Sequence, residues 1–266
     1  MSYVESEDGT RIAFTREGSG PAVVLVGGGL DDGSENVPLA TELAKSFTVY
    51  NYARRGRGES GDSLPYAVER EVEDVDALIE EAGGTAHLFG ASSGGALVLE
   101  AAASGVSAAR LAVYEVPYSL GADAVAHWQR YVEDLRGALA GGHRDEALAL
   151  FMRLAGSNDA DIDSARHSEF WEPLLVLAPT LAYDAAVLGD GAPPADRVSG
   201  ISQPTLVLTG GGSDPAMQGL QPNFFGTAAD AIAAVIPGAV RRTIHSEGHV
   251  ADPQVLGEAL REFFQR

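Results

Sequence analysis

One serine of the chain stands in a pattern that suits a nucleophile. Residues 90–95 read Gly-Ala-Ser-Ser-Gly-Gly, directly after the apolar run 86–89 and before a helical stretch that ends near residue 103. A G-x-S-x-G pattern between a strand and a helix predicts a tight turn, because its glycines leave room where side chains would clash. Such a turn exposes the hydroxyl of Ser92. It also places the N–H of Ser93 at a helix N-terminus, where it can bind an oxyanion.

A serine nucleophile requires a general base, and near neutral pH histidine is the simplest one. His249 follows the last predicted strand and precedes the C-terminal helix. In a parallel sheet this position lies at the carboxyl edge, as Ser92 does, so His249 is the predicted base. His245, at the end of the same strand, is the alternative. Core, surface or cap positions are expected for the other histidines: His87, His127, His143 and His167.

Two carboxylates could orient the imidazole of the base and stabilise its charged form. Asp214 comes after the predicted strand 205–208, and Glu115 ends the strand that follows the nucleophile helix. Both positions are at the carboxyl edge of a parallel sheet. The residues alone do not choose between these two acids, and either could instead be an ordinary turn or surface residue.

A run of three glycines could supply the second donor of an oxyanion hole. Gly27-Gly28-Gly29 follows the predicted strand 22–26 at once, and glycines let backbone N–H groups approach a reacting carbonyl closely. Gly29 is the predicted donor, together with Ser93. The run fits neither of the glycine patterns that bind nucleotide phosphates. The carboxylates also lack a ligand-like spacing, so no cofactor and no metal are expected.

Apolar periodicity predicts the elements that must position these residues. Strands are expected at 11–15, 22–26, 47–52, 86–89, 111–114, 205–208 and 240–244, and helices at 37–46, 69–81, 94–103, 228–235 and 255–264. The first residues suggest a strand hairpin around Glu7-Asp8-Gly9. Strands that alternate with helices predict an α/β fold, a mostly parallel sheet covered on both faces.

The alternation stops between Pro117 and Arg197, where only helical patterns occur, at 122–139, 144–154, 165–171 and 174–188. We therefore expect a helical cap subdomain at 118–197, inserted into a core domain made of 1–117 and 198–266. Most aromatic residues of the cap should form its own core. A few residues are candidates for the wall of a substrate pocket between cap and sheet: Leu30, Trp128, Trp171 and Tyr183.

Composition limits the partners of this 266-residue chain. Its formal net charge is −20 and Lys45 is the only lysine, which argues against binding to nucleic acid or to an anionic membrane. The absence of cysteine excludes disulfides and thiolate chemistry. Neither a signal peptide nor an apolar run of about 20 residues is evident, so a soluble cytoplasmic protein is expected. A homodimer is compatible with the sequence.

With these pieces in place, the chain resembles the α/β-hydrolase superfamily over nearly its whole length. The resemblance rests on 24–29 (Val-Leu-Val-Gly-Gly-Gly), 54–60 (Arg-Arg-Gly-Arg-Gly-Glu-Ser), the pattern around Ser92, and His249. The usual His-Gly is here Gly27-Gly28, and the usual Asp before the arginine motif is Ala53. The resemblance implies an α/β-hydrolase fold, with a mostly parallel central sheet flanked by helices and an inserted helical cap.

A narrower likeness bears on the acid. The segment 90–94 together with Tyr114-Glu115-Val116-Pro117 resembles the zearalenone lactonase branch and a broader set of actinobacterial-type hydrolases. In that branch the acid is a glutamate on the strand after the nucleophile turn, at the position of Glu115 here. The resemblance therefore favours Glu115 over Asp214, and it implies Gly29 and Ser93 as oxyanion donors.

These residues together predict a serine hydrolase that cleaves a carboxylic ester or a lactone of a hydrophobic small molecule through an acyl-enzyme. A serine at the turn argues against a dehalogenase or an epoxide hydrolase, whose related folds usually carry aspartate there. Two alternatives stay open because the fold does not fix the chemistry. One is a C–C hydrolase, a lyase or a non-hydrolytic cyclase on the same fold. The other is a ligand-binding receptor that lacks turnover.

Overall fold

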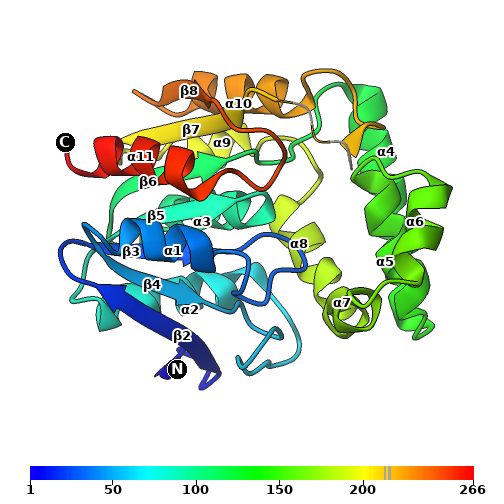
Figure 1. Ribbon diagram of the computed structural model, residues 1–266, viewed down its shortest axis with the longest axis horizontal. Coiled ribbons are helices and arrows are strands. Elements are labelled where there is room, and N and C mark those ends of the chain that lie inside the picture. Colours follow the sequence, from blue (N-terminus) through cyan, green and yellow to red (C-terminus); the bar gives the residue numbers. More distant parts are fainter. Residues whose placement is uncertain (213, 215–216) are drawn as a thin grey trace.

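The computed structural model describes residues 1–212, 214 and 217–266. The described residues form an eight-stranded sheet in the order β1-β2-β4-β3-β5-β6-β7-β8 (Figure 1). β1 (Ser2–Glu5) and β2 (Arg11–Gly18) form the expected N-terminal hairpin, and β2 pairs antiparallel with β4. The remaining pairs are parallel. They join β3 (Ala22–Val26), β4 (Thr48–Tyr52), β5 (Ala86–Ala91), β6 (Ala108–Tyr114), β7 (Thr205–Gly210) and β8 (Val240–Ile244). The predicted α/β fold is confirmed.

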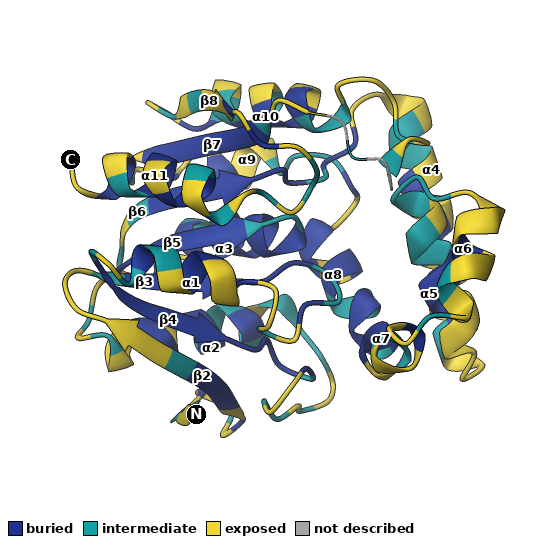
Figure 2. Ribbon diagram, viewed as in Figure 1, coloured by how far each residue is buried: buried dark blue, intermediate teal, exposed yellow. Residues whose placement is uncertain are grey.

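The central strands are buried on both faces, which explains why they read as continuous apolar runs. In β3, Val24 and Val26 enter one apolar cluster, and Val23 and Leu25 enter another on the opposite face. The first cluster includes side chains of α2 (Val68–Glu81), α3 (Ser93–Ala103) and α10 (Phe224–Val235). The second includes side chains of α1 (Val37–Leu43) and α11 (Pro253–Phe264). Burial is therefore greatest in the central strands, such as β3, β4, β5 and β7, as Figure 2 shows.

The chain between β6 and β7 lies entirely within the described residues and contains no strand. We call this segment the helical insertion. Its elements are α4 (Ala122–Ala140), α5 (Arg144–Leu154), α6 (Asp159–Arg166), α7 (Trp171–Leu177), a 3₁₀ turn (Ala178–Thr180), α8 (Leu181–Leu188) and α9 (Ala195–Val198). In Figure 1 the helices α4 to α7 stand beyond the ends of the strands, while α8 lies close to the sheet. No helix among the described residues is long and apolar enough to cross a membrane.

Two predicted helices of the insertion are wrong in their limits. The helix expected at 165–171 is instead α6, which starts earlier because the side chain of Asn158 caps it by accepting from the N–H groups of Ala160 and Asp161. The helix expected at 174–188 is divided into α7 and α8. The 3₁₀ turn between them contains Pro179, which has no N–H to continue the hydrogen bonds of a helix.

Candidate active site

Ser92 occupies a strained turn between β5 and α3. Its backbone has φ 54° and ψ −130°, a conformation that a non-glycine residue adopts only when its surroundings enforce it. A Cβ atom added to Gly90 would overlap the carbonyl oxygen of Gly94, and one added to Gly94 would overlap that of Val26. The glycines of the pattern are thus required by the packing of the backbone, as the sequence predicts.

Strand register brings Ser92 level with Glu115. In the parallel pair β5–β6, Ala91 is the partner of Tyr114, and the N–H of Ser92 donates to the carbonyl oxygen of Tyr114 at 2.8 Å. Glu115 follows directly and has a left-handed backbone, with φ 47°. Its own N–H donates to the carbonyl oxygen of Leu208 in β7 at 3.0 Å. The carboxyl ends of three neighbouring strands therefore meet at this point.

The two candidate acids contact different parts of His249. The Oε2 atom of Glu115 lies 2.7 Å from Nδ1 of the imidazole, while its Oε1 atom accepts the N–H of Gly210 at 2.9 Å. Asp214 accepts the backbone N–H of His249 through Oδ2 at 2.8 Å. A carboxylate at Nδ1 makes that nitrogen the donor in the neutral ring, which leaves Nε2 as the basic atom. Ser213 and Pro215, the neighbours of Asp214 in its motif, lie outside the described residues.

An aromatic side chain also packs against the imidazole of His249. Phe225 at the start of α10 stacks on His249, with ring centroids 4.8 Å apart and planes inclined by 17°. Nothing in the local sequence of Phe224-Phe225 distinguishes this phenylalanine from a core residue. The sequence analysis therefore missed it.

The other histidines lie in different surroundings. His87 packs in the core and stacks on Phe264 with a centroid distance of 4.6 Å, and burial lowers its pKa to about 4. His245, the alternative base, is exposed after β8. The three histidines of the insertion are exposed as well: His127, His143 and His167.

The predicted oxyanion donors belong to the two segments that meet at Ser92, the glycine loop and the start of α3. A Cβ atom added to Gly28 would come within 3.1 Å of the Cβ of Ser92, so the glycine loop packs against the nucleophile turn. Ser93 is the first residue of α3, where backbone N–H groups have no acceptor within the helix. Leu30 closes the loop with φ 61° and packs against apolar residues of both the core and the insertion.

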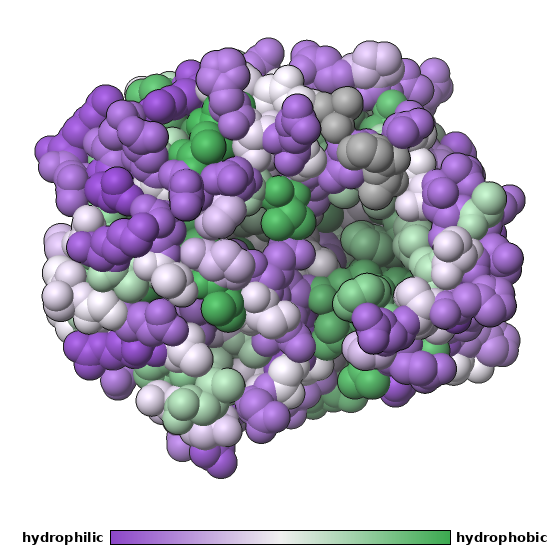
Figure 3. Space-filling view, in the orientation of Figure 1, coloured by the Kyte–Doolittle hydropathy of each residue, from purple (hydrophilic) through white to green (hydrophobic). Residues whose placement is uncertain are grey.

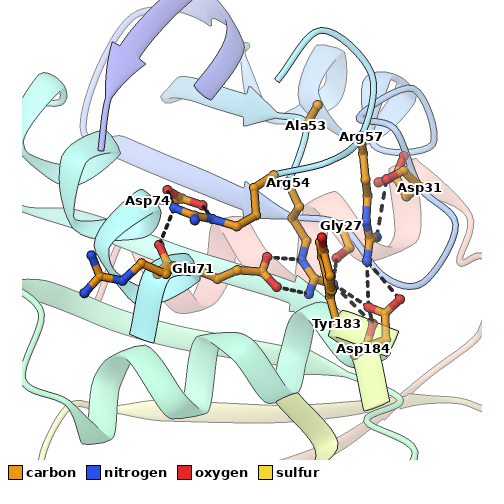
Figure 4. A network of polar contacts seen from close by, with 12 residues as sticks. Gly27, Asp31, Ala53, Arg54, Arg57, Glu71, Asp74, Tyr183 and Asp184 are labelled. Atoms are coloured by element: carbon orange, nitrogen blue, oxygen red, sulfur yellow. Dashed lines mark hydrogen bonds and ion pairs between the residues drawn. The ribbon is translucent and has the colours of Figure 1, made fainter. Parts of the chain in front are cut away.

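A buried ionic network, which the sequence analysis missed, lies behind the glycine loop (Figure 4). Arg54 forms a two-pronged pair with Glu71 at 2.6 and 2.7 Å, and its Nη1 donates to Oδ1 of Asp184 at 2.7 Å. Arg57 donates through Nη2 to both oxygens of Asp184 at 2.8 Å. The signal in the sequence is the Arg-Arg-Gly-Arg run at 54–57. This run carries part of the family resemblance, but its partners lie far away in the chain and are not evident from the sequence.

The charges of this network are mutually compensated. Burial alone would raise the pKa of Asp184, but the positive charges of Arg57 and Arg54 outweigh it and hold that pKa below its usual range. Glu71 behaves alike: burial opposes its charged form, and Arg54 lowers its pKa overall. Both carboxylates, Asp184 and Glu71, therefore remain ionised at neutral pH. A buried charge of this kind would be costly without its partner.

The remaining pocket candidates make packing contacts within or near the insertion. Trp128 lies beside Tyr131 and donates from Nε1 to the carbonyl oxygen of Gly189 at 3.0 Å. Trp171 belongs to an apolar cluster of α5, α6 and the 3₁₀ turn. Tyr183 stacks on Tyr66 at 3.9 Å. Their contact with a substrate remains a prediction. Among the described residues there is no group of three or more His, Asp or Glu side chains arranged to hold a metal ion.

Comparisons with known proteins identify the family to which this fold belongs. The family model described as the alpha/beta hydrolase family matches residues 23–260. A solved alpha/beta hydrolase from Sphaerobacter thermophilus is 42% identical, with a TM-score of 0.87, and the alignment covers 99% of this chain and 100% of the other. A thermophilic esterase from Thermogutta terrifontis is 25% identical with a TM-score of 0.70, and the alignment covers 99% of this chain and 97% of the esterase.

One curated relative is also similar. It is described as an uncharacterized hydrolase, YraK, of Bacillus subtilis, and is 29% identical over 153 residues. That alignment covers 55% of each chain, so the match spans about half the length of the curated relative.

Proposed function

Because the chain belongs to the alpha/beta hydrolase family, we propose that it is a serine hydrolase of carboxylic esters or lactones that works through an acyl-enzyme. The observation that carries this proposal is the 2.7 Å contact between Glu115 Oε2 and His249 Nδ1, beside the strained turn of Ser92. In this reaction Ser92 attacks the carbonyl carbon while His249 removes its proton through Nε2. Glu115 holds the ring in the productive tautomer and stabilises its charged form.

The tetrahedral intermediate carries a negative charge on the former carbonyl oxygen. We assign its stabilisation to the N–H groups of Gly29 and Ser93, which belong to the glycine loop and to the start of α3. His249 then protonates the leaving alcohol and activates the water that hydrolyses the acyl-enzyme. No cofactor is needed for these steps.

We further propose that the helical insertion caps this site and selects an uncharged, hydrophobic substrate. Figure 3 supports the idea, since it shows a hollow between the sheet side and the insertion, with apolar residues gathered on the insertion side. The ring of Phe151 in α5 would lie 3.6 Å from a Cβ atom built on Gly29, so the insertion reaches the glycine loop. The formal net charge of −20 also disfavours anionic substrates. Lactones are included as substrates because of the narrower resemblance to the zearalenone lactonase branch.

The first test is labelling with a fluorophosphonate and turnover of p-nitrophenyl esters and a panel of lactones. We expect labelling of the wild type, none of Ser92→Ala, and a rate loss of roughly 10⁴- to 10⁶-fold for that variant. Full turnover by Ser92→Ala on every substrate of the parent would refute the proposal. Binding of a ligand without any product would favour a receptor. Turnover without labelling would favour the non-nucleophilic chemistries.

The second test compares the two acids. Glu115→Gln removes the charge beside Nδ1 and should reduce kcat by about 10³- to 10⁴-fold. Asp214→Asn keeps an oxygen that can accept the backbone N–H of His249, so its kcat should stay within about 10-fold of the parent. The reverse order of effects would move the acid role to Asp214.

A further inference from the structure

The proposed reaction leaves two arginines and one aspartate of the buried network without a role. The side chains of Arg54, Arg57 and Asp184 are each no more than 8% exposed. Their charges therefore do not serve to attract a substrate from solution. These residues lie between the glycine loop, the nucleophile helix and α8 of the insertion (Figure 4). On the basis of the proposed function, we propose that Arg57 and Asp184 are positioning residues that set the geometry of the oxyanion hole.

Arg57 acts on the peptide between Gly28 and Gly29. Nη1 of Arg57 donates to the carbonyl oxygen of Gly28. In a trans peptide the carbonyl oxygen and the N–H of the next residue point in opposite directions. A carbonyl fixed toward Arg57 therefore turns the N–H of Gly29 away from the buried network. Gly28 itself packs on Ser92, so this N–H belongs to the segment that faces the reacting carbon.

Glycine makes this control necessary. Three successive glycines leave the loop free to adopt several backbone conformations, and the peptide plane would otherwise be poorly determined. Arg54 adds a weaker restraint, with Nη1 at 3.4 Å from the carbonyl oxygen of Gly27. The orientation of the Gly29 donor thus depends on Arg57, because the loop lies beyond the end of β3, and Arg54 restrains the preceding peptide.

Asp184 also holds Ser93, the residue that carries the other proposed oxyanion donor. Its hydroxyl donates to Oδ1 of Asp184 at 2.7 Å, which ties the first residue of the nucleophile helix to the same carboxylate that holds Arg57. Both predicted oxyanion donors are therefore supported by one aspartate. Asp184 comes from α8, so an element of the insertion supports the oxyanion hole although it supplies no donor.

The chain offers a matched control for a buried ion pair. Arg55 pairs with Asp74 at 2.7 and 2.8 Å, and neither side chain is exposed. The other partners of Arg55 are Asp8 and the carbonyl oxygen of Arg70, and neither belongs to the glycine loop. Variants at Arg55 and Asp74 thus disturb a similar buried charge without touching the proposed donors.

The experiment compares Arg57→Met and Asp184→Asn with Arg55→Met and Asp74→Asn on one p-nitrophenyl ester. We expect kcat to fall by about 10- to 100-fold in the first pair, less than the full loss of a donor, with KM within about threefold. A trifluoromethyl ketone, which forms a tetrahedral adduct with the serine, should bind more weakly by a similar factor. The control pair should lower thermal stability and leave kcat and inhibitor affinity unchanged. Equal losses of kcat in both pairs would overturn the proposal.

Crystal structures of the same variants separate this inference from the proposed function. The peptide between Gly28 and Gly29 should be rotated in Arg57→Met and unchanged in Arg55→Met. An unrotated peptide in Arg57→Met overturns the inference, whatever the rates are. If Arg57→Met does not fold, Asp184→Asn provides the same comparison. A wild type that neither hydrolyses esters nor labels at Ser92 refutes the proposed function, while the peptide orientation still decides the positioning role.

Discussion

The carboxyl edge of the sheet and the helical insertion are built in opposite ways. At the edge, backbone atoms pack so closely that glycines are obligatory, and polar side chains are paired in networks with little exposure. In the insertion, apolar contacts dominate: Trp171 lies in a cluster formed by insertion helices, and Trp128 joins the cluster that also covers one face of the sheet. Asp184 is the point at which a side chain of the insertion enters the polar network of the edge. The proposed catalytic residues thus lie in the most tightly packed part of the molecule, and substrate selection is expected to rest on a part that tolerates repacking.

The largest effect should come from one added methyl group at the edge. In Gly94→Ala the new Cβ would overlap the carbonyl oxygens of Val26 and Gly27, which cannot yield without displacing the glycine loop. We expect a loss of at least about 3 kcal/mol in the free energy of unfolding, measured with urea, and a loss of ester turnover.

The matched change in the insertion is Gly137→Ala in the helix α4. Nothing lies within 4 Å of the added Cβ, so it should stabilise the protein by about 0.5–1 kcal/mol. Similar responses at both positions would contradict the contrast between the two regions.

A similar loss of stability, but without a loss of turnover, is expected from Trp171→Ala. The indole is 5% exposed within its apolar cluster, and removing it should cost about 3–5 kcal/mol by urea unfolding. Turnover of a small ester per folded molecule should stay within about threefold of the wild type. The neighbouring Phe170 is 67% exposed, so Phe170→Ala serves as the control and should change stability by less than about 0.5 kcal/mol. Lost turnover with intact stability would instead place Trp171 in the wall of the substrate pocket.

A last effect appears only at acid pH and concerns His87, at the end of β5 remote from the nucleophile turn. The pKa of His87 is lowered from 6.5 to about 4, so the unfolded chain binds a proton first as the pH falls. Stability is therefore lost between pH 6.5 and pH 4, by about 2 kcal/mol at pH 5 relative to neutral pH. His87→Phe should remove about that part of the acid sensitivity in urea titrations at pH 7 and pH 5. His127→Gln, at an exposed position, should leave it as in the wild type. An unchanged pH dependence in His87→Phe would show that another group is responsible.

Much of the fold could be predicted because its signals are local. The alternation of apolar strands and helices predicted the sheet. The glycines at 90 and 94 predicted the nucleophile turn, because a side chain at either position would overlap the backbone. The errors in the insertion are also local in cause. The cap at Asn158 and the break at Pro179 outweighed an apolar pattern that, read alone, favoured other helix limits.

The turn at Ser92, the order of the elements and the candidate partners could be read from the sequence alone, because each depends on residues close together in the chain. The sequence did not determine which acid contacts the imidazole. Glu115 and His249 are 134 positions apart, and their contact follows from the register of β5, β6 and β7. The pairing of Arg54 and Arg57 with Asp184 spans 130 and 127 positions. The tertiary structure decided these contacts, since the energy of a buried charge depends on the partners that folding brings within reach.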